Sequence, residues 1–341
     1  MTKMTAQSTL SEKPLAEPTA VWVLTDGTVG MENQAVAVAE ALGLPFAVKR
    51  VKRRGLVKAM PTWLQVLAPP TTLFGAIEPE GDTLAPPWPR LVISVGRHSV
   101  PLALAVKRIS GGRTAALHIQ NPQVPAGLFD LVAAPAHDGL SGANVVVTEG
   151  APHRVTPARL QAEAALFATQ VAPLPRPRVA VLIGGQSRAY RFDEADAAAL
   201  GAHLRGLSER SGCGLLITPS RRTGPQNIAA LVEALKISPA LIWDGESANP
   251  YFGFLAHADA VIVTEDSVNM VTEAAGTGKP VYVYPMVGRS RRFHDFHARL
   301  RSLGVTRRFD GTLGSWSYAP INDSEKITVA LRRLLGTRLS S

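Results

Sequence analysis

The stretch Asp259-Ala-Val-Ile-Val-Thr-Glu-Asp-Ser-Val-Asn-Met-Val-Thr-Glu-Ala-Ala-Gly-Thr-Gly-Lys-Pro-Val-Tyr-Val-Tyr-Pro285 decides the fold. An apolar run at 260–264 is followed by polar residues, by a helical pattern over 267–277 with a glycine stop, and by a second apolar run at 281–284. That order of strand, helix and strand is a βαβ unit, whose strands lie parallel in a sheet covered by helices. The sequence therefore predicts an α/β fold.

The same pattern repeats on both sides of a break at Pro173-Leu-Pro-Arg-Pro177. Prolines at this density interrupt regular structure, so we expect a domain boundary there. We expect a flexible tail over 1–18, an N-terminal Rossmann-like domain over 19–172 and a C-terminal Rossmann-like domain over 178–335. The two domains should face each other across a cleft at the carboxyl ends of their strands. The expected strands are 21–25, 91–95, 115–119, 130–134 and 144–148 in the first domain, and 179–183, 215–218, 241–243, 260–264 and 281–284 in the second.

Composition and charge narrow the class of protein. A chain of 341 residues with 46% hydrophobic and 18% charged residues suits two folded domains. Its one cysteine cannot form an internal disulfide, and neither a signal-peptide core nor an apolar run near the ~20 residues of a membrane span is present. We therefore expect a cytoplasmic protein with at most peripheral membrane contact. The net charge of +9 suits phosphorylated ligands or anionic lipid, and no nucleic acid partner is expected.

The helix after the strand at 260–264 carries the strongest prediction of a ligand site. Ser267 at its start leaves backbone N–H groups free to bind a phosphate, which the helix dipole also favours. Asp266, Met270 and Glu273 share one helical face, so a carboxylate there can accept hydrogen bonds from both hydroxyls of a ribose. The alternative is that Asp266 and Ser267 only cap the helix and that Glu273 is solvated.

Two further loops follow neighbouring strands of the same domain. Paired glycines at Gly184 and Gly185 allow a ligand to approach the backbone closely, and Ser187 and Arg188 add a hydroxyl and a cation suited to a diphosphate. The next strand ends in a second polar set, which comprises Ser220, Arg221 and Arg222. Simple surface exposure is the alternative for the two arginines. We expect all these residues to bind a nucleoside diphosphate.

The segment from 259 to 285 resembles the donor-binding segment of B-type glycosyltransferases. Over roughly residues 20 to 335 the chain also resembles bacterial relatives of the plant mitochondrial fission (elongated mitochondria) family. The matching motifs are Asp26-Gly, Glu32-Asn-Gln34, His118-Ile-Gln-Asn-Pro122, Phe129-Asp-Leu, Pro135-Ala-His-Asp138, Thr148-Glu-Gly-Ala-Pro-His-Arg154, Ile183-Gly-Gly, Ser220-Arg-Arg-Thr223, Asp266-Ser-Val-Asn-Met270 and Thr277-Gly-Lys-Pro280. The resemblance implies two Rossmann-like domains of the glycosyltransferase B type and a eukaryotic branch that acts as a membrane-surface adaptor. It implies no particular substrate.

The sugar transfer that the resemblance implies needs a general base. From this sequence we expect neither a metal ion nor a cofactor. No Asp-x-Asp pair supplies a metal–diphosphate clamp, and the first turn, Gly27-Thr-Val-Gly30, lacks the three-glycine dinucleotide fingerprint. His294 and His297 have no third metal ligand, so we favour a surface pair. The candidate bases lie in loops after N-terminal strands: Asp26, which we prefer, Glu32, His98 and Asp138. For each, a turn-forming or capping role is the alternative.

A basic segment precedes an apolar one in the N-terminal domain. Lys49 to Lys58 holds six cations and no acid, and Trp63 with Leu67 follows directly, which is typical of an interfacial anchor on anionic lipid. The alternative is that Trp63 and Leu67 pack in the core. The leading hypothesis is a nucleotide-sugar-dependent glycosyltransferase with a lipid-linked or envelope acceptor. A non-catalytic membrane-surface adaptor and a nucleotide-sugar 2-epimerase are the alternatives.

Overall fold

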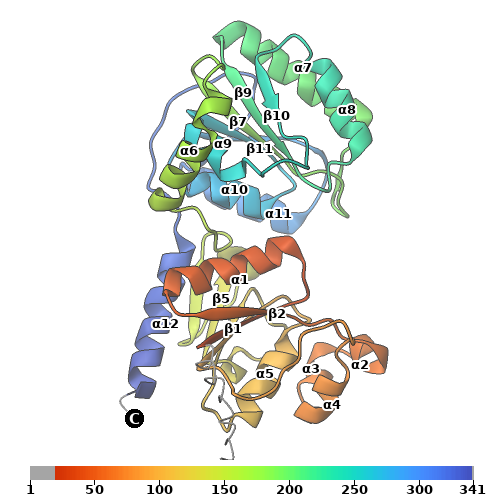
Figure 1. The fold of residues 1–341 in the computed structure, drawn as a ribbon, viewed down its shortest axis with the longest axis vertical. Coiled ribbons are helices and arrows are strands. Elements are labelled where there is room, and N and C mark those ends of the chain that lie inside the picture. The colour runs from red at the N-terminus through yellow and green to blue at the C-terminus, as the bar shows by residue number, and fades with distance from the viewer. Residues whose placement is uncertain (1–19, 340–341) are drawn as a thin grey trace, which may run out of the picture.

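A computed structural model describes residues 20–339 of the chain, which form two lobes joined by two crossing segments (Figure 1). Each lobe is built on a parallel sheet of six strands. The α/β fold with two facing Rossmann-like domains, expected from the sequence, is therefore confirmed. The tail expected at 1–18 lies outside the described residues.

The N-terminal sheet has the order β2-β1-β3-β4-β5-β6. Helices α1 and α12 cover one face, and α5 with the short helices α3 and α4 covers the other. The buried side chains of its strands are mostly aliphatic, with Trp22, Ser94 and His118 among the exceptions, which suits strands that are buried on both faces. The elements are β1 (Val21–Thr25), α1 (Val29–Leu42), β2 (Phe46–Arg50), α2 (Gly55–Ala59), α3 (Thr62–Gln65), α4 (Pro70–Gly75), β3 (Leu91–Val95), α5 (Val100–Ile109), β4 (Ala115–Ile119), β5 (Leu131–Pro135) and β6 (Val145–Thr148).

The C-terminal sheet has the order β10-β9-β7-β11-β12-β14. This is the nucleotide-binding arrangement in which the first strand of the domain, β7, lies beside the fourth, β11. Helices α7 and α8 cover one face, and α9, α10 and α11 cover the other. The elements are β7 (Arg178–Ile183), α7 (Glu194–Ser211), β9 (Gly214–Pro219), α8 (Pro225–Ala234), β10 (Ala240–Ile242), α9 (Tyr251–His257), β11 (Ala260–Thr264), α10 (Val268–Ala275), β12 (Val281–Tyr284), α11 (Arg291–Ser302) and β14 (Thr306–Arg308). A small hairpin pairs β8 (Tyr190–Arg191) with β13 (Val287–Gly288).

Two helices lie on the opposite lobe from the one that the sequence boundary at 173–177 assigns them to (Figure 1). Helix α6 (Pro157–Val171) packs against α9 of the C-terminal lobe, where a Cβ on Gly253 would collide with Phe167. The last helix, α12 (Asp323–Leu339), returns to the N-terminal lobe and buries Ile327 and Leu331 in its core. The chain therefore crosses between lobes before α6 and before α12, because each helix follows its apolar partner.

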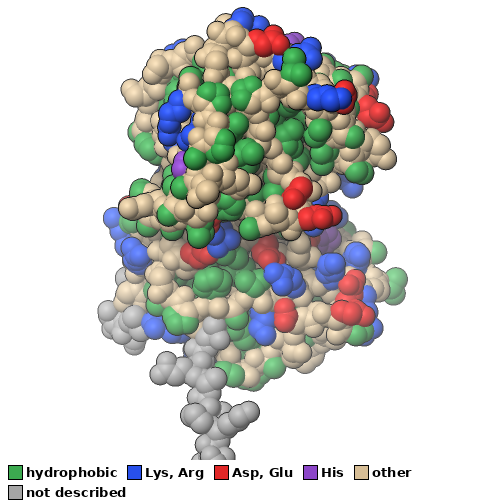
Figure 2. All heavy atoms as spheres, turned by 45° about the horizontal axis from the view of Figure 1, so that its top comes forward, with side chains coloured by type: hydrophobic (Ala, Val, Ile, Leu, Met, Phe, Trp, Pro, Cys, Tyr) green, Lys and Arg blue, Asp and Glu red, His purple; other side chains and the backbone are tan. Residues whose placement is uncertain are grey.

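The carboxyl ends of the strands meet where the lobes face each other. Figure 2 shows acidic and basic side chains along the narrower waist there, and the ion pairs between the lobes include Arg154 with Glu40 and Arg299 with Glu149. In both sheets the strand order reverses next to the first strand, between β1 and β3 and between β7 and β11. Open α/β sheets bind ligands at such switch points. Within residues 20–339, no helix combines the length and the apolar character needed to cross a bilayer.

Candidate functional site

Asp266 organises the switch point of the C-terminal lobe. Its carboxylate is buried, accepts hydrogen bonds from the Gly185 amide (3.0 Å) and the Thr264 hydroxyl (2.7 Å), and pairs with the Arg222 guanidinium (2.7 Å). Burial raises the pKa of Asp266, while Arg222 works in the opposite direction. The side chain thus ties the loop after β11 to the loops after β7 and β9 and has no oxygen left facing a ligand.

The close packing around Asp266 and Arg222 explains why residues 184 and 185 are both glycine. A Cβ on Gly184 would lie 2.2 Å from the Asp266 carboxylate, and a Cβ on Gly185, whose φ is +136°, would lie 2.2 Å from the Arg222 carbonyl. The Gly184 amide donates to the Thr264 hydroxyl at 2.8 Å, so neither glycine amide is free. The loop therefore needs glycine for its own close packing before any ligand arrives.

Of the remaining residues predicted for these loops, the two serines form hydrogen bonds within the protein and two of the arginines are exposed. The Ser187 hydroxyl accepts from the Tyr190 amide, and the Ser220 hydroxyl donates to the Gly184 carbonyl. Arg188 and Arg221 are exposed, and among the described residues no ion pair holds either of them. The structure brings the predicted residues together, and these two guanidinium groups stay available to an anion.

The N-terminal end of helix α10 faces the N-terminal lobe. Ser267 caps it by accepting from the Met270 amide at 3.4 Å, while the Met270 side chain packs against the core beneath. The first-turn amides of Val268 and Asn269 have no acceptor within the helix, because an α-helix leaves its first N–H groups unpaired. The Asn269 side chain spans the cleft and joins Gln34 of α1 (2.8 Å).

Glu273 lies deeper along the same helix. It accepts a hydrogen bond from the Tyr251 hydroxyl, at the start of α9. Burial raises the pKa of Glu273 to about 7, which the Tyr251 bond and the charges of Arg154 and Arg159 partly oppose. A carboxylate whose ionised form is this poorly solvated gains from any further hydrogen-bond donors.

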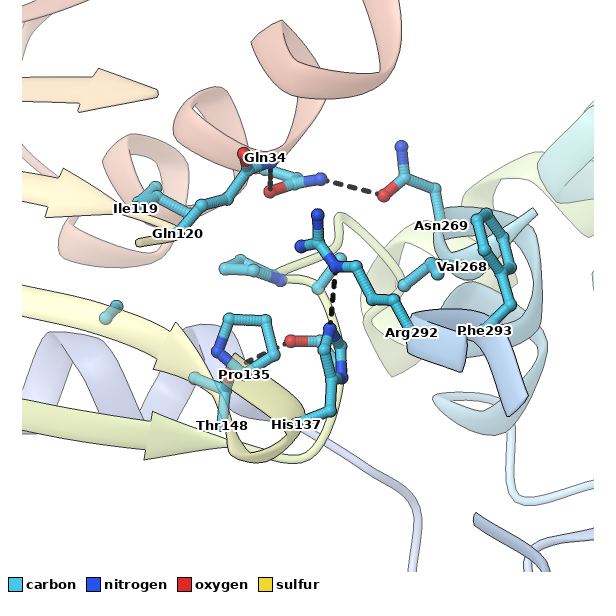
Figure 3. A pocket seen from close by; sticks show the side chains of 14 residues that line it. Gln34, Ile119, Gln120, Pro135, His137, Thr148, Val268, Asn269, Arg292 and Phe293 are labelled. Atoms are coloured by element: carbon cyan, nitrogen blue, oxygen red, sulfur yellow. Dashed lines mark hydrogen bonds between the residues drawn. The ribbon is translucent and has the colours of Figure 1, made fainter. Parts of the chain in front are cut away.

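A cavity of about 190 Å³ separates the lobes beside the start of α10 (Figure 3). The N-terminal lobe contributes side chains from the ends of β4 and β5 and from α1, and the C-terminal lobe contributes the starts of α10 and α11. Gln120, directly after β4, has a φ of 82°, a strained value for a residue other than glycine. Its amide donates to Gln34 at 3.2 Å, so the two glutamines and Asn269 form a chain across the cleft.

His137 and Arg292 face each other in this cavity (Figure 3). The Arg292 Nε donates to the His137 Nε2 at 3.0 Å, which requires a neutral imidazole with its proton on Nδ1. Burial lowers the pKa of His137, although neighbouring Asp138 raises it. The Asp138 carboxylate lies 3.6 Å from the Arg292 Nε. The structure thus groups a cation, a neutral histidine and a carboxylate at one point of the cleft.

The four candidate bases do not lie together. Asp138 lies beside His137 and Arg292, whereas Asp26 and His98 line a second cavity at the β1–β3 switch point. Glu32 accepts from Arg50 in an ion pair of 2.7 Å. Asp138 is therefore the candidate base that the fold places beside Arg292 of the C-terminal lobe.

Reasoning from the sequence missed Gln34, Gln120, His137, Asn269 and Arg292 as site residues. The first four lie within the motifs that carry the family resemblance, and His137 and Asn269 directly precede the candidates Asp138 and Met270. Arg292 had no such signal, because α11 reaches the cleft only through the packing of the folded lobe.

His297 is not half of a surface pair. It is buried, and its Nε2 hydrogen-bonds the Glu265 carbonyl at 2.8 Å. Across residues 20–339, no three His, Cys, Asp or Glu side chains are grouped so that they could hold a metal ion.

The basic segment at 49–58 is also less uniform than expected. Lys49 lies over the Trp22 ring, Arg50 pairs with Glu32, and Arg53 is buried at 3% exposure, so Arg53 cannot contact lipid directly. The exposed cations are Lys52, Arg54 and Lys58. Trp63 and Leu67 do not pack in the core, since they are 59% and 70% exposed, and Leu56 is 87% exposed.

Solved structures share this architecture. A UDP-GlcNAc 2-epimerase from Methanocaldococcus jannaschii superposes with a TM-score of 0.50 at 13% identity, over 92% of each chain. Os79 from O. sativa, solved in complex with UDP, superposes with a TM-score of 0.51 at 13% identity, over 92% of this chain and 91% of that chain. These superpositions show a shared fold of the glycosyltransferase B type, and at 13% identity they show the fold alone.

Sequence comparison reaches closer relatives. The mitochondrial fission protein ELM1 of Arabidopsis thaliana is 32% identical over 278 residues, which cover 73% of this chain and 65% of that protein, so under two thirds of its length is matched. An uncharacterized protein of Rickettsia prowazekii, RP120, is 25% identical over 352 residues, covering 92% of this chain and 97% of that protein. The model of the family described as mitochondrial fission ELM1 matches residues 29–335. The chain therefore belongs to the mitochondrial fission ELM1 family.

Proposed function

We propose that this protein transfers a sugar from a nucleoside diphosphate to a hydroxyl of a lipid-linked or envelope acceptor, without a metal ion. One observation carries the proposal: a single interdomain cavity holds the start of α10, the Arg292 guanidinium and neutral His137. Free helix amides and an arginine suit a diphosphate leaving group. A neutral imidazole across from them suits proton removal from an acceptor.

The C-terminal lobe is the proposed donor site. The diphosphate lies at the amides of Val268 and Asn269, within reach of Arg188 or Arg221, and the ribose hydroxyls donate to Glu273. Os79 was solved with UDP, and the M. jannaschii protein is a UDP-GlcNAc 2-epimerase, so uridine nucleotides are the first donors to test. Asp266, Gly184 and Gly185 hold the loops in place and do not touch the nucleotide.

The proposed transfer needs one proton movement. The bound diphosphate attracts Arg292, which leaves the His137 Nε2 without its hydrogen bond. The acceptor hydroxyl then loses its proton to Nε2 while its oxygen bonds to the anomeric carbon, and the bond from that carbon to the diphosphate oxygen breaks. Arg292 and the α10 amides balance the charge that develops on the leaving diphosphate. Asp138 stabilises the imidazolium that results.

Calorimetric titration with UDP, ADP, GDP and CDP, in excess chelator, tests the donor site. At least one nucleoside diphosphate should bind at pH 8, where Glu273 is ionised, and Glu273→Gln should weaken that binding by about tenfold or more, because a charged acceptor of two hydroxyls is lost. Glu233→Gln, at an exposed position on α8, is the matched control and should bind as the unaltered protein does. If all four nucleotides fail to bind the folded protein, the transferase proposal is wrong and a non-catalytic adaptor role is favoured.

We also propose a peripheral position on the cytoplasmic face of a membrane. Leu56, Trp63 and Leu67 are apolar, exposed and carried on or beside the short helices α2 and α3. Exposed Lys52, Arg54 and Lys58 lie in the same segment. Indole and aliphatic groups next to cations suit the interface of an anionic bilayer.

A further inference from the structure

The switch point of the N-terminal lobe contains a second cavity, of about 490 Å³, that the proposed transfer does not use. It lies where β1, β2 and β3 end, and its titratable lining comprises Asp26, Lys52, Arg53, Lys58, Glu78 and His98. Arg53 is the unusual member. Its side chain is 3% exposed, yet its Nε and Nη1 atoms have no hydrogen-bond partner.

A buried guanidinium without an acid is costly. Within residues 20–339, Arg53 forms no ion pair, and its one side-chain bond runs from Nη2 to the His98 Nδ1 at 3.1 Å. Burial, and then the charge of nearby Arg97, lower the pKa of Arg53 to about 10. A protein that leaves two donors of a buried cation unpaired loses stability, unless a ligand supplies the acceptors.

The other charged groups around Arg53 indicate that the ligand is an anion. Lys52, Lys58 and exposed Arg97 add positive charge, against two carboxylates, Asp26 and Glu78. His98 accepts from Arg53 through Nδ1, so its proton lies on Nε2, which makes it a further donor and not a base while that bond holds. Burial, then Arg53 and Arg97, lower the pKa of His98, which keeps it neutral.

We propose that this cavity binds a phosphate group, which accepts hydrogen bonds from the Arg53 guanidinium once that side chain turns toward the ligand. Nη2 together with either Nη1 or Nε forms a planar fork that gives a phosphate two parallel bonds, and the surrounding lysines suit its double charge. Leu56 of α2, 87% exposed, lies three residues from Arg53, so an apolar chain attached to the phosphate has a surface to cover. The phosphate site does not rest on the proposed transferase function.

Calorimetry on the full chain tests the site with two probes: dihexanoyl phosphatidic acid, below its micellar concentration, and inorganic phosphate. Dihexanoylglycerol, which has the same tails without the phosphate, serves as the ligand control and should not bind. Arg53→Met should weaken the binding of the phosphate probes by about tenfold or more. The matched control is Arg54→Met, because Arg54 is exposed and does not line the cavity. Lys58→Met, an exposed lining residue whose loss does not endanger folding, should weaken binding by about threefold.

The outcomes separate this site from the donor site. Arg53→Met should keep its UDP affinity within about twofold, so a lost nucleotide site and a lost phosphate site are distinguishable. Tighter binding of phosphatidic acid than of inorganic phosphate assigns the site to a lipid phosphate, and equal binding assigns it to a free phosphate. If Arg53→Met, Lys58→Met and the unaltered protein bind both probes equally, the proposal is overturned.

Discussion

The switch points of the two lobes occupy equivalent places in their sheets but satisfy their buried charges in opposite ways. In the C-terminal lobe, buried Asp266 has an ion pair with Arg222 and two further hydrogen bonds. In the N-terminal lobe, buried Arg53 has one bond, to a neutral His98, and two nitrogen atoms without a partner. A charge whose partners are complete belongs to the scaffold, whereas a charge that lacks them leaves room for a ligand.

The glycines in the loop after β7 are required by packing within the protein itself. Paired glycines after a strand are commonly explained by a ligand that approaches the backbone, yet Gly184 and Gly185 are pressed against Asp266 and Arg222 of the protein itself. The loop is rigid for structural reasons, and rigidity is what a phosphate site at the neighbouring α10 needs.

The largest effect is expected from breaking the satisfied switch point. Gly184→Ala places a methyl group 2.2 Å from the Asp266 carboxylate, so the free energy of unfolding should fall by about 3 kcal/mol. Gly75→Ala is the control, because no atom lies within 4 Å of its added Cβ, and it should change stability by less than about 0.5 kcal/mol. Equal denaturation midpoints for the two variants in urea would mean that the Asp266 contacts do not constrain the loop.

A smaller effect concerns Glu273, which is half-buried and forms no ion pair within the described part of the chain. The folded protein keeps this proton up to about pH 7, whereas the unfolded chain loses it near the ordinary value of 4.5, so stability falls as pH rises between these values. Glu273→Gln cannot ionise and should be about 2 kcal/mol more stable than the unaltered protein at pH 8, with no difference at pH 4. Unfolding curves at the two pH values check this. A constant difference at both would show that Glu273 is not a buried acid.

Arg53→Met tests the switch point of the N-terminal lobe, where the buried charge has unpaired donors, through its effect on stability. Removing an unpaired buried cation in favour of an apolar chain of similar length should raise the free energy of unfolding, without ligand, by about 1 kcal/mol. The comparison is again Arg54→Met, which should be neutral. A destabilised Arg53→Met protein would show that the guanidinium holds the scaffold together, as Asp266 does.

The smallest effect is expected at the exposed apolar residues. Leu67→Ala should weaken co-sedimentation with anionic vesicles about fourfold, as expected for roughly 0.8 kcal/mol of lost burial. Leu166→Ala is the matched control, since Leu166 is an equally exposed leucine, at 76%, on the C-terminal lobe. Binding should also rise with anionic lipid and fall with salt. Equal sedimentation of both variants would place the membrane contact elsewhere or nowhere.

The sequence predicted most strands because a buried parallel strand is a continuous apolar run, as in Val179 to Ile183 and Ala260 to Thr264. It missed the edge strands β2 and β14, whose residues are largely half-buried or exposed and do not form such a run. It misassigned α6 and α12, because a helical pattern reveals an apolar face but not which lobe that face will meet. The burial of Arg53 was equally invisible, since a cation in a basic run reads as surface. Residues such as Arg292 gain their place only when two lobes close on each other.

Amide exchange measured by NMR tests the central claim, that a nucleoside diphosphate binds at the start of α10 in the interdomain cavity. Without ligand, the amides of Val268 and Asn269 should exchange rapidly, since the helix gives them no acceptor. Saturation with the tightest-binding nucleoside diphosphate should slow both amides by about tenfold or more, as a phosphate takes up their hydrogen bonds. Bound nucleotide with unchanged exchange at Val268 and Asn269 would contradict the account.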